Sequence, residues 1–556
     1  MTVNSDKKTI DKYLKDFYAF IEKNATWLNS YCVYKTLKDK YHQAGCKNWF
    51  NADLNLSKDQ IIERWIDQTQ VFDVRFYAWE QYIAHLQFSE AAQKIREMGI
   101  TLKGDLPILL NEDSCDVWHT PELFNMKFRA GSPPDKDNPT GQNWGFPVYD
   151  WKAQKENGYA WWKLRLSETK KYFDAFRLDH IPGFFRFWAF KDGELTAEMG
   201  ATVPYSAITT ATLLNNGFST ERIRWLSEPH IPTEDIFRLT GNVNQSIEIL
   251  SVACDRIGRE QLWNFKSCIK TSGDIKKLDF SNFDLDEEIQ EEIREKLLGW
   301  WKNRVLIEVK KGNFLPYHNY KFSSAWNSLT EEEKETLSEL LDANEKKQEK
   351  QWRAQAESIF SEIIPSSGMT ACGEDLGIKI DCMGDVMKKF GILGLKVVRW
   401  CRDWRKENSP FEDLQSYSKL SLVTTSVHDS STLRQWWNEE KTSAKEFERA
   451  FLIPKDSAET PRIYEEKFNP QIAEKVLSAI AHTSGAWFVP PIQDWLYLDE
   501  NFYAENAKTE RINIPGTVSD FNWTWRMPAN VDELKNSKIL KEKIKKISKI
   551  HDSVVQ

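Results

Sequence analysis

The chain has 556 residues, of which 41% are hydrophobic and 28% are charged, and its formal net charge is −8 at pH 7. A chain of this length can form one large domain with an insertion, or two to three domains, and the composition is typical of a soluble globular protein. The negative charge argues against nucleic acid and anionic membranes as partners, because no basic field is present to attract phosphates. No apolar run approaches the length of a membrane span, so we expect neither such a span nor a secretion signal.

Cysteine and tryptophan usage narrows the class of protein. The eight cysteines have no paired short spacing of the kind that holds zinc or exchanges disulfides, which indicates reduced thiols and a cytoplasmic location. The 24 tryptophans are unusually many for this length. Aromatic rings stack on the C–H faces of sugars, which fits a carbohydrate site, but composition alone favours large packed cores.

Helices are predicted first in the chain, over residues 1–98. Two sets of apolar residues recur there at helical spacing, and Gly99 follows them as a helix stop. The first set is Ile10, Leu14, Phe17 and Ile21, and the second is Phe76, Trp79, Ile83 and Leu86.

Short apolar runs typical of buried strands follow this helical segment. Helical patterns, such as those over residues 161–171 and 443–451, lie between them, and the alternation predicts parallel strands joined by crossover helices. In α/β barrels, active sites form at the C-terminal ends of such strands. The predicted strands lie within residues 100–110, 173–178, 368–375, 393–400, 421–429 and 486–495.

The longest segments between these strands differ in character. Residues 111–151 are polar and rich in Pro, Gly and Trp, which predicts a long binding loop. Residues 195–364 are charged and mostly helical in pattern, and a capping box at Thr330 and Glu333 opens a long helix. We interpret this block as a helical insertion, with an independent linker domain as the alternative. The predicted domains are a helical segment over 1–98, barrel parts over 99–194 and 365–530, the insertion over 195–364, and a C-terminal helix within 531–556 that docks through Leu540, Ile544 and Ile547.

Carboxylates stand at or near the ends of four predicted strands: Asp105, Asp179, Glu374 and Asp429. Each alone could cap a helix, and Asp179 could form a buried ion pair with Arg177. Together they fit retaining glycosidic chemistry, which needs a carboxylate nucleophile and a second carboxyl that acts as acid and then as base. An arginine beside the nucleophile favours its charged form, and an acid near an ionised one has its pKa raised. Metal binding is the competing chemistry, but the acids form no dense DxD or HxxxH cluster.

Five segments of the chain form long sequence blocks: GDLPILLNEDSCDVW, AGSPPDKDNPTGQNWGFPVYDW, FRLDHIPGFFRFW, ACGEDLG and VHDSSTLRQWW. They resemble, in the same order, the blocks of the 4-α-glucanotransferases of glycoside hydrolase family 77, the amylomaltase and disproportionating-enzyme group. The resemblance covers residues 60–190 and 365–530. The helical insertion and the sequences ACGEDLG and HDSSTLRQWW resemble those of the type-2 disproportionating enzymes.

The resemblance implies a TIM-type (β/α)8 barrel and a double-displacement transfer of glucosyl or maltosyl units between α-1,4-glucans, maltose or malto-oligosaccharides. It assigns Asp179 as the nucleophile, Glu374 as the general acid/base and Asp429 as the stabiliser of the transition state. In a retaining enzyme the first two carboxyls should lie about 5–6 Å apart. The reaction needs no cofactor and no metal. The implied substrate-binding residues are Arg177, His428, Asp105, Asp135, Gln142, Trp144, His180 and Asn513.

The chain departs from the family's pattern near its beginning. The first two barrel strands of the family carry a WQ-x-LP segment and an SPYS segment, and nothing here matches either. We therefore expect a barrel that lacks its first strands and leaves two sheet edges unpaired. Two alternatives thus stand beside the transferase: an inactive glucan-binding fragment, and an α-glucan hydrolase that uses the same acids.

Overall fold

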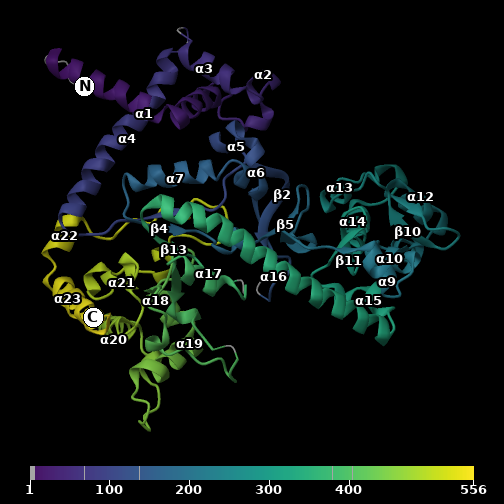
Figure 1. Cartoon of the computed structure of the whole chain (residues 1–556). Helices are drawn as coiled ribbons and strands as arrows, with labels where there is room; N and C mark the ends of the chain where they lie inside the picture. The colour runs from purple at the N-terminus through teal and green to yellow at the C-terminus, as the bar shows by residue number, and fades with distance from the viewer. Residues whose placement is uncertain are drawn as a thin grey trace. The chain divides into compact units, whose positions relative to one another are not determined.

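The computed structural model describes residues 7–67, 69, 71–136, 138–377, 380–403 and 405–555. The chain forms two compact units, which are described separately (Figure 1). Unit 1 comprises Met1–Asp174 and Pro182–Gly368, and unit 2 comprises Ala175–Ile181 and Met369–Gln556. The domain boundaries drawn from the sequence stay a prediction.

Unit 1 begins with helices, as predicted; residues 1–6 lie outside the described part of the chain. The helices are α1 (Lys7–Lys40), α2 (Asn51–Leu54), α3 (Lys58–Ile66) and α4 (Val71–Glu97). Half of the predicted apolar face of α1 is buried, at Phe17 and Ile21, and Ile10 and Leu14 are exposed. The predicted apolar face of α4 is largely exposed, at Phe76, Trp79 and Leu86. The buried line of α4 is Val74, Ala78 and Tyr82, and Tyr82 packs edge-on or tilted against aromatic rings of α1.

The segment 111–151, predicted as a long loop, instead contains a β-hairpin. Strands β2 (Phe124–Ser132) and β3 (Gln142–Tyr149) pair with β5 (Phe187–Lys191) and β6 (Ala201–Val203) in an antiparallel sheet of order β3-β2-β5-β6. The prediction was wrong because β2 obtains a partner, β5, from outside the segment. Gly131 permits the pairing, since a side chain there would meet the carbonyl oxygen of Gln142 at 1.9 Å.

The block 195–364 is helical with short strands that the sequence pattern does not reveal. These strands have two to five residues and form two antiparallel sheets, β8-β10-β9 and β11-β12-β7. The predicted capping box is confirmed: Thr330 Oγ1 accepts from the Glu333 amide over 3.2 Å, and the Glu333 carboxylate accepts from the Thr330 amide over 2.8 Å. It opens α16 (Glu331–Ser367), the long helix in Figure 1.

The remaining elements of unit 1 have these bounds: β1 (Lys103–Leu106), α5 (Cys115–His119), α6 (Trp151–Glu156), α7 (Ala160–Lys170), α8 (Pro182–Phe185), β7 (Ile208–Thr209), α9 (Thr210–Asn215), α10 (Thr220–Ser227), β8 (Ile231–Pro232), α11 (Thr233–Thr240), α12 (Val243–Ala253), β9 (Cys254–Arg256), β10 (Leu262–Phe265), α13 (Ser272–Lys276), α14 (Glu287–Lys302), β11 (Leu306–Lys310), β12 (Asn313–Pro316) and α15 (Ser324–Asn327).

Unit 2 is built on parallel strands in the order β4-β13-β14-β15-β16. They confirm the strands predicted from residue 173 onward, and the strand order follows the chain order, as in an α/β barrel. Short apolar strands buried on both faces suit a parallel sheet covered by helices. Their bounds are β4 (Ala175–Leu178), β13 (Thr370–Gly373), β14 (Leu393–Val397), β15 (Ser421–Thr424) and β16 (Trp487–Phe488).

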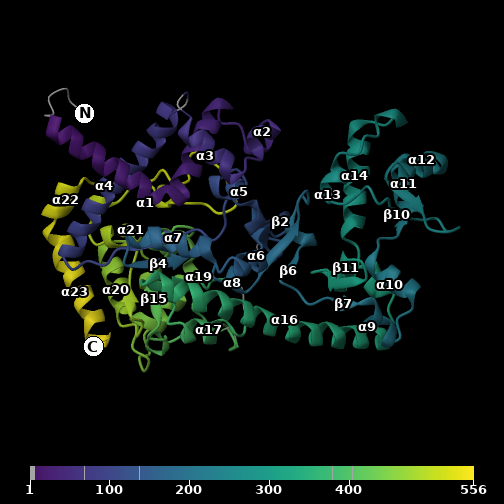
Figure 2. The same ribbon diagram turned by 45° about the horizontal axis from the view of Figure 1, so that its top comes forward.

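The helices of unit 2 pack around a core that includes the buried Trp437, Phe447 and Tyr497. The predicted docking of the C-terminal helix is confirmed, because Leu540 and Ile547 of α23 are buried in this core and α23 packs against α20 (Figure 2). Across the described residues of both units, no helix combines the length and apolar character needed to cross a membrane. The helices are α17 (Met383–Lys389), α18 (Leu433–Glu439), α19 (Lys441–Phe447), α20 (Pro470–Ala481), α21 (Ile492–Leu496), α22 (Val531–Asn536) and α23 (Lys538–Val555).

Candidate active site

Two carboxylates leave neighbouring parallel strands at the same level. In the register of β4 and β13, Leu178 pairs with Gly373, so Asp179 and Glu374 are the first residues beyond the aligned ends. Such strand ends are the usual position of catalytic groups in α/β barrels. The geometry brings together the two acids that the sequence analysis assigned as nucleophile and acid/base.

The turn after Asp179 binds Glu374 through main-chain groups. The His180 amide donates to Glu374 Oε2 over 2.9 Å, and the Ile181 amide donates to the Glu374 carbonyl over 3.0 Å. His180 adopts a positive φ of 39°, a conformation that is uncommon outside glycine and often found at functional sites. The His180 side chain was predicted to bind substrate, and in this turn it is the His180 backbone that contacts Glu374.

Burial and charge set the protonation of Glu374. Its surroundings raise its pKa to about 7, mainly through burial, while the Arg177 guanidinium acts in the opposite direction and the nearby Asp179 charge adds to the rise. Arg177 also forms an ion pair with Asp179, with Nη1 2.9 Å from Oδ1. The site therefore holds one acid ion-paired to arginine and a second that carries a proton near neutral pH.

The third predicted acid, Asp429, follows β15 and is held by two side chains. His428 Nε2 lies 3.2 Å from Asp429 Oδ2, and Asn513 Nδ2 donates to Asp429 Oδ1 over 2.6 Å. Burial favours the neutral form, but these hydrogen bonds outweigh it and lower the pKa of Asp429, with further help from the Arg177 charge. Asp429 is thus kept ionised close to Arg177, which also contacts Asp179.

The turn that presents His428 and Asp429 rests on buried polar residues that the sequence analysis did not select. Asp494 is fully buried and accepts from the Thr425 hydroxyl, from Ser426 Oγ over 3.2 Å and from the Leu433 amide over 3.1 Å. Arg399, just beyond β14, donates to both the hydroxyl and the carbonyl of Ser431 over 2.6 Å. Arg399 lies just beyond β14, and Asp494 lies in α21 at the end of the strand predicted over residues 486–495, which is the signal that could have pointed to them.

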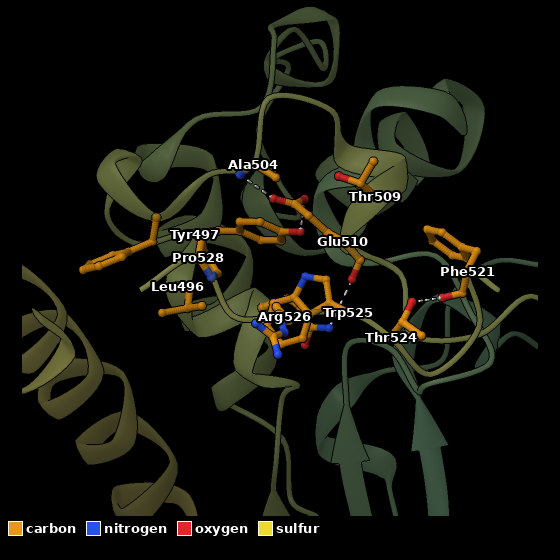
Figure 3. Close-up of a pocket in the computed structure, with 12 residues that line it drawn as sticks. Leu496, Tyr497, Ala504, Thr509, Glu510, Phe521, Thr524, Trp525, Arg526 and Pro528 are labelled. Atoms are coloured by element: carbon orange, nitrogen blue, oxygen red, sulfur yellow. Dashed lines mark hydrogen bonds between the residues drawn. The ribbon is translucent and has the colours of Figure 1, made fainter. Parts of the chain in front are cut away.

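Glu510 anchors the segment that carries Asn513. Its carboxylate accepts from Arg434 Nη1 over 3.0 Å, from the Ala504 amide over 3.0 Å and from the Tyr497 hydroxyl over 2.5 Å. In Figure 3 this carboxylate lies between the Ala504 amide and the Tyr497 hydroxyl. A cavity of about 220 Å³ adjoins Glu510, and its walls include Leu496, Phe502, Phe521 and Trp525. The anchor fixes the chain immediately before Arg511, whose guanidinium donates to the Asp429 carbonyl over 3.3 Å.

Asp375 follows Glu374 but has a different environment. It accepts from the Leu395 amide of β14 over 2.8 Å, and burial raises its pKa. A side chain on Gly394 would meet the Asp375 carboxylate at 2.9 Å. Asp375 therefore joins β13 to β14, and Glu374 alone of this pair hydrogen-bonds to the turn after Asp179.

The other predicted site residues belong to unit 1. Asp105 lies in β1, Gln142 opens β3, and Trp144 donates from its indole nitrogen to Gln142 Oε1 over 3.1 Å. Asp135 lies between β2 and β3, where its carboxylate accepts from the Asn138 amide over 2.7 Å. Their part in substrate binding stays a prediction. Among the described residues of both units, no group of three or more His, Cys, Asp or Glu is placed to hold a metal ion.

Parallel strands whose ends carry three acids, an arginine and a histidine define a glycosidase-like site. The chain matches glycoside hydrolase family 77, described as 4-alpha-glucanotransferase, over residues 2–265 and 290–532, and it belongs to this family. The 4-alpha-glucanotransferase DPE2 of Oryza sativa subsp. japonica is 32% identical over 97% of this chain. The 4-alpha-glucanotransferase of Chlamydia caviae is 26% identical over 94% of it. The chain spans 56% of the length of the rice protein and 68% of the length of the chlamydial one.

Solved structures give the same fold. The amylomaltase from Streptococcus agalactiae in complex with acarbose has a TM-score of 0.59 at 16% identity, covering 97% of this chain and 75% of that one. The amylomaltase from Corynebacterium glutamicum has a TM-score of 0.53 at 13% identity, covering 97% and 56%. The likeness shows an α/β barrel-like fold, in agreement with the ordered parallel strands of unit 2.

Proposed function

We propose that the protein is a retaining 4-α-glucanotransferase that moves glucosyl or maltosyl units between α-1,4-glucans, maltose or malto-oligosaccharides. The observation that carries this proposal is the pairing of Asp179 and Glu374 at aligned strand ends, with a proton held on Glu374 up to about neutral pH. Family membership supports the choice of α-glucans as substrates.

In the first step, Asp179 attacks C1 of the donor sugar and the bond from C1 to the leaving glycosidic oxygen breaks. Glu374 gives its proton to that oxygen, so the shortened glucan leaves as an alcohol and the glycosyl unit stays on Asp179 as an ester. The raised pKa of Glu374 suits this role, because the acid must still be protonated near neutral pH. Asp429, kept ionised by its hydrogen bonds, stabilises the positive charge that develops on the sugar ring and holds its hydroxyls.

In the second step, Glu374, now a carboxylate, takes the proton from an acceptor sugar hydroxyl. The acceptor oxygen attacks C1, the ester bond to Asp179 breaks, and the configuration at C1 is retained after two inversions. A sugar acceptor in place of water makes the reaction a transfer, and this requires that water be excluded while the ester exists. We assign Asp105, Asp135, Gln142, Trp144 and His180 to the sugar-binding sites.

We propose a barrel of the TIM type for the catalytic fold and, from the free cysteines, a cytoplasmic location. A hydrolase with the same acids is the rival within this site. The test is incubation of the purified chain with maltotriose, with Asp179→Asn as the matched blank. Transfer predicts glucose together with longer malto-oligosaccharides, and products longer than maltotriose should be absent from the blank. Glucose and maltose without longer products would show that the protein is a hydrolase and not a transferase. Equal activity in the blank would contradict the assignment of Asp179 as the nucleophile.

A further inference from the structure

Two tryptophans in the segment after Asn513 have contrasting environments. Trp525 packs against the core of unit 2 and lines the cavity beside Glu510. Trp523 is 64% exposed, although burial of a tryptophan is a large source of stability. Packing therefore accounts for Trp525 and leaves the position of Trp523 unexplained.

The backbone of Trp523 is held in a costly conformation. Its φ is +64°, in the left-handed region, where a bulky side chain is a genuine outlier. Hydrogen bonds across the loop enforce this conformation: the Trp523 amide donates to the Ile512 carbonyl over 2.8 Å, and the Ile514 amide donates to Asn522 Oδ1 over 3.1 Å. Asn522 Nδ2 in turn donates to the Thr517 carbonyl over 3.0 Å. Strain that a surrounding network maintains is characteristic of ligand-binding positions.

The strained conformation brings the indole to the acids of the site. Its ring centroid lies 5.2 Å from that of His428, at an interplanar angle of 42°. His428 contacts Asp429. Asn513, in the same segment as Trp523, donates from its side chain to Asp429, and its main-chain amide donates to the His428 carbonyl over 3.1 Å. The exposed indole thus stands beside the group proposed to stabilise the transition state.

We propose that Trp523 is a substrate-binding residue, whose indole stacks on the C–H face of a glucosyl ring held next to Asp429. This inference rests on the proposed function and adds one contact to it. An exposed aromatic face can stack on a sugar, and the loop hydrogen bonds hold the Trp523 backbone in place before the sugar binds, which reduces the entropy lost on binding. The same loop positions Asn513, so one segment both orients Asp429 and contacts the sugar.

The test combines affinity with stability, because a structural tryptophan and a binding tryptophan differ in both. Trp523→Gly removes the ring and suits the positive φ, while Trp523→Phe keeps an aromatic face. Val518→Ala is the matched control, since Val518 is exposed in the same loop and makes no part of the proposed contact. Each change is made in the full chain with Asp179→Asn, so that maltotetraose binds without turnover, and affinity is measured by titration calorimetry.

We expect Trp523→Gly to weaken maltotetraose binding about tenfold. Its melting temperature should be no lower than that of its parent, because the lost ring contact with His428 is offset by relief of backbone strain at the positive φ. Trp523→Phe should recover most of the affinity, and Val518→Ala should bind as the parent does. Unchanged affinity in Trp523→Gly, or an equal loss in Val518→Ala, would overturn the inference.

Failure of the proposed function gives a different pattern. If the Asp179→Asn parent binds no malto-oligosaccharide, both the proposed function and the proposed sugar contact of Trp523 are contradicted. If binding depends on Trp523 but the unmodified chain transfers no glucosyl unit, the transferase proposal is contradicted and the sugar contact is supported. If the unmodified chain is an active transferase and binding does not depend on Trp523, only the sugar contact is contradicted.

Discussion

The amide of His180 donates to Oε2 of Glu374 over 2.9 Å, so the turn that follows the proposed nucleophile also holds the proposed acid/base. The two residues are far apart in the chain and become neighbours because Leu178 and Gly373 pair in adjacent parallel strands. The spacing of the carboxyls is therefore set by strand register and by one backbone hydrogen bond, and not by flexible side chains alone.

Gly373→Ala should disrupt this register. A side chain at Gly373 would meet Ile181 Cδ1 at 2.5 Å and Ile181 Cβ at 3.3 Å, so the buried Ile181 side chain must shift and presses on the turn after Asp179. We expect a loss of about 1–3 kcal/mol in the free energy of unfolding, as for an overpacked core, and a fall in transfer rate of at least tenfold. Urea denaturation and maltotriose disproportionation measure the two effects.

Gly384→Ala is the matched control for that substitution. Gly384 lies in α17, and nothing stands within 4 Å of the added methyl group. Because alanine is the better helix former, the free energy of unfolding of this variant should be at least that of the unmodified protein, and its activity should be kept. A Gly373→Ala variant that is as stable and active as Gly384→Ala would contradict the packing argument.

The pH dependence of transfer should report Glu374. Its pKa of about 7 predicts that kcat/KM for maltotriose falls as pH rises through 7, because the leaving oxygen then lacks its proton donor. α-Maltosyl fluoride is a donor whose leaving group needs no proton. With this donor, the rate of the first step, in which the sugar is transferred to Asp179, should fall only at higher pH. A rate for maltotriose that stays level up to pH 9 would exclude Glu374 as the acid.

Glu374→Gln should stabilise the fold at alkaline pH while it removes activity. Burial raises the pKa of Glu374 from an ordinary value of 4.5 to about 7, so the folded state binds more protons than the unfolded state between these values. The contribution of Glu374 to the free energy of unfolding therefore falls as pH rises from 4.5 through 7, and the penalty is complete above 7. Glutamine avoids this penalty, which predicts a gain of about 2–3 kcal/mol at pH 8 and a much smaller one at pH 4.5.

Denaturant unfolding of both proteins at the two pH values measures this difference. A gain that is equal at pH 4.5 and pH 8 would show that the effect comes from packing and not from ionisation.

The strand-end acids could be predicted from the sequence because Asp179 and Glu374 directly follow short apolar runs, and Asp429 follows one with only residues 425–428 between. The runs before Asp179, Glu374 and Asp429 are strands in the structure, and their parallel order places the three acids in one unit. The local pattern contains both the strand and the residue that leaves it, so no long-range information is needed to find them.

Residues that act through distant partners could not be found in this way. Glu510 is buried because Arg434 and Tyr497 bind its carboxylate, and nothing in its local sequence distinguishes it from a surface acid. The β2–β3 hairpin could not be predicted for the same reason, because β2 pairs with β5, which lies outside the segment whose composition indicated a loop. The exposed position of Trp523 depends on its positive φ, and a tryptophan in the sequence gives no indication of that conformation.

Asn513→Ala should shift the acid side of the pH profile. Asn513 donates to Asp429 and helps to lower the pKa of that carboxyl, so its loss leaves burial less opposed and the pKa rises. We expect the acidic fall of the transfer rate to move to higher pH. Asn530→Ala, which removes the cap of α22, should cost about 1 kcal/mol of stability and leave the pH profile unchanged.

A covalent intermediate on Asp179 is the central claim, and trapping it is the most direct test. The Glu374→Gln variant should still accept a maltosyl unit from α-maltosyl fluoride, because fluoride leaves without a proton, but should release it slowly for want of a base. Peptide mass spectrometry after rapid acid quenching should then find one maltosyl group on the peptide that contains Asp179, and none when Asp179→Asn is added. A maltosyl group on another residue, or steady transfer by the double variant, would contradict the account.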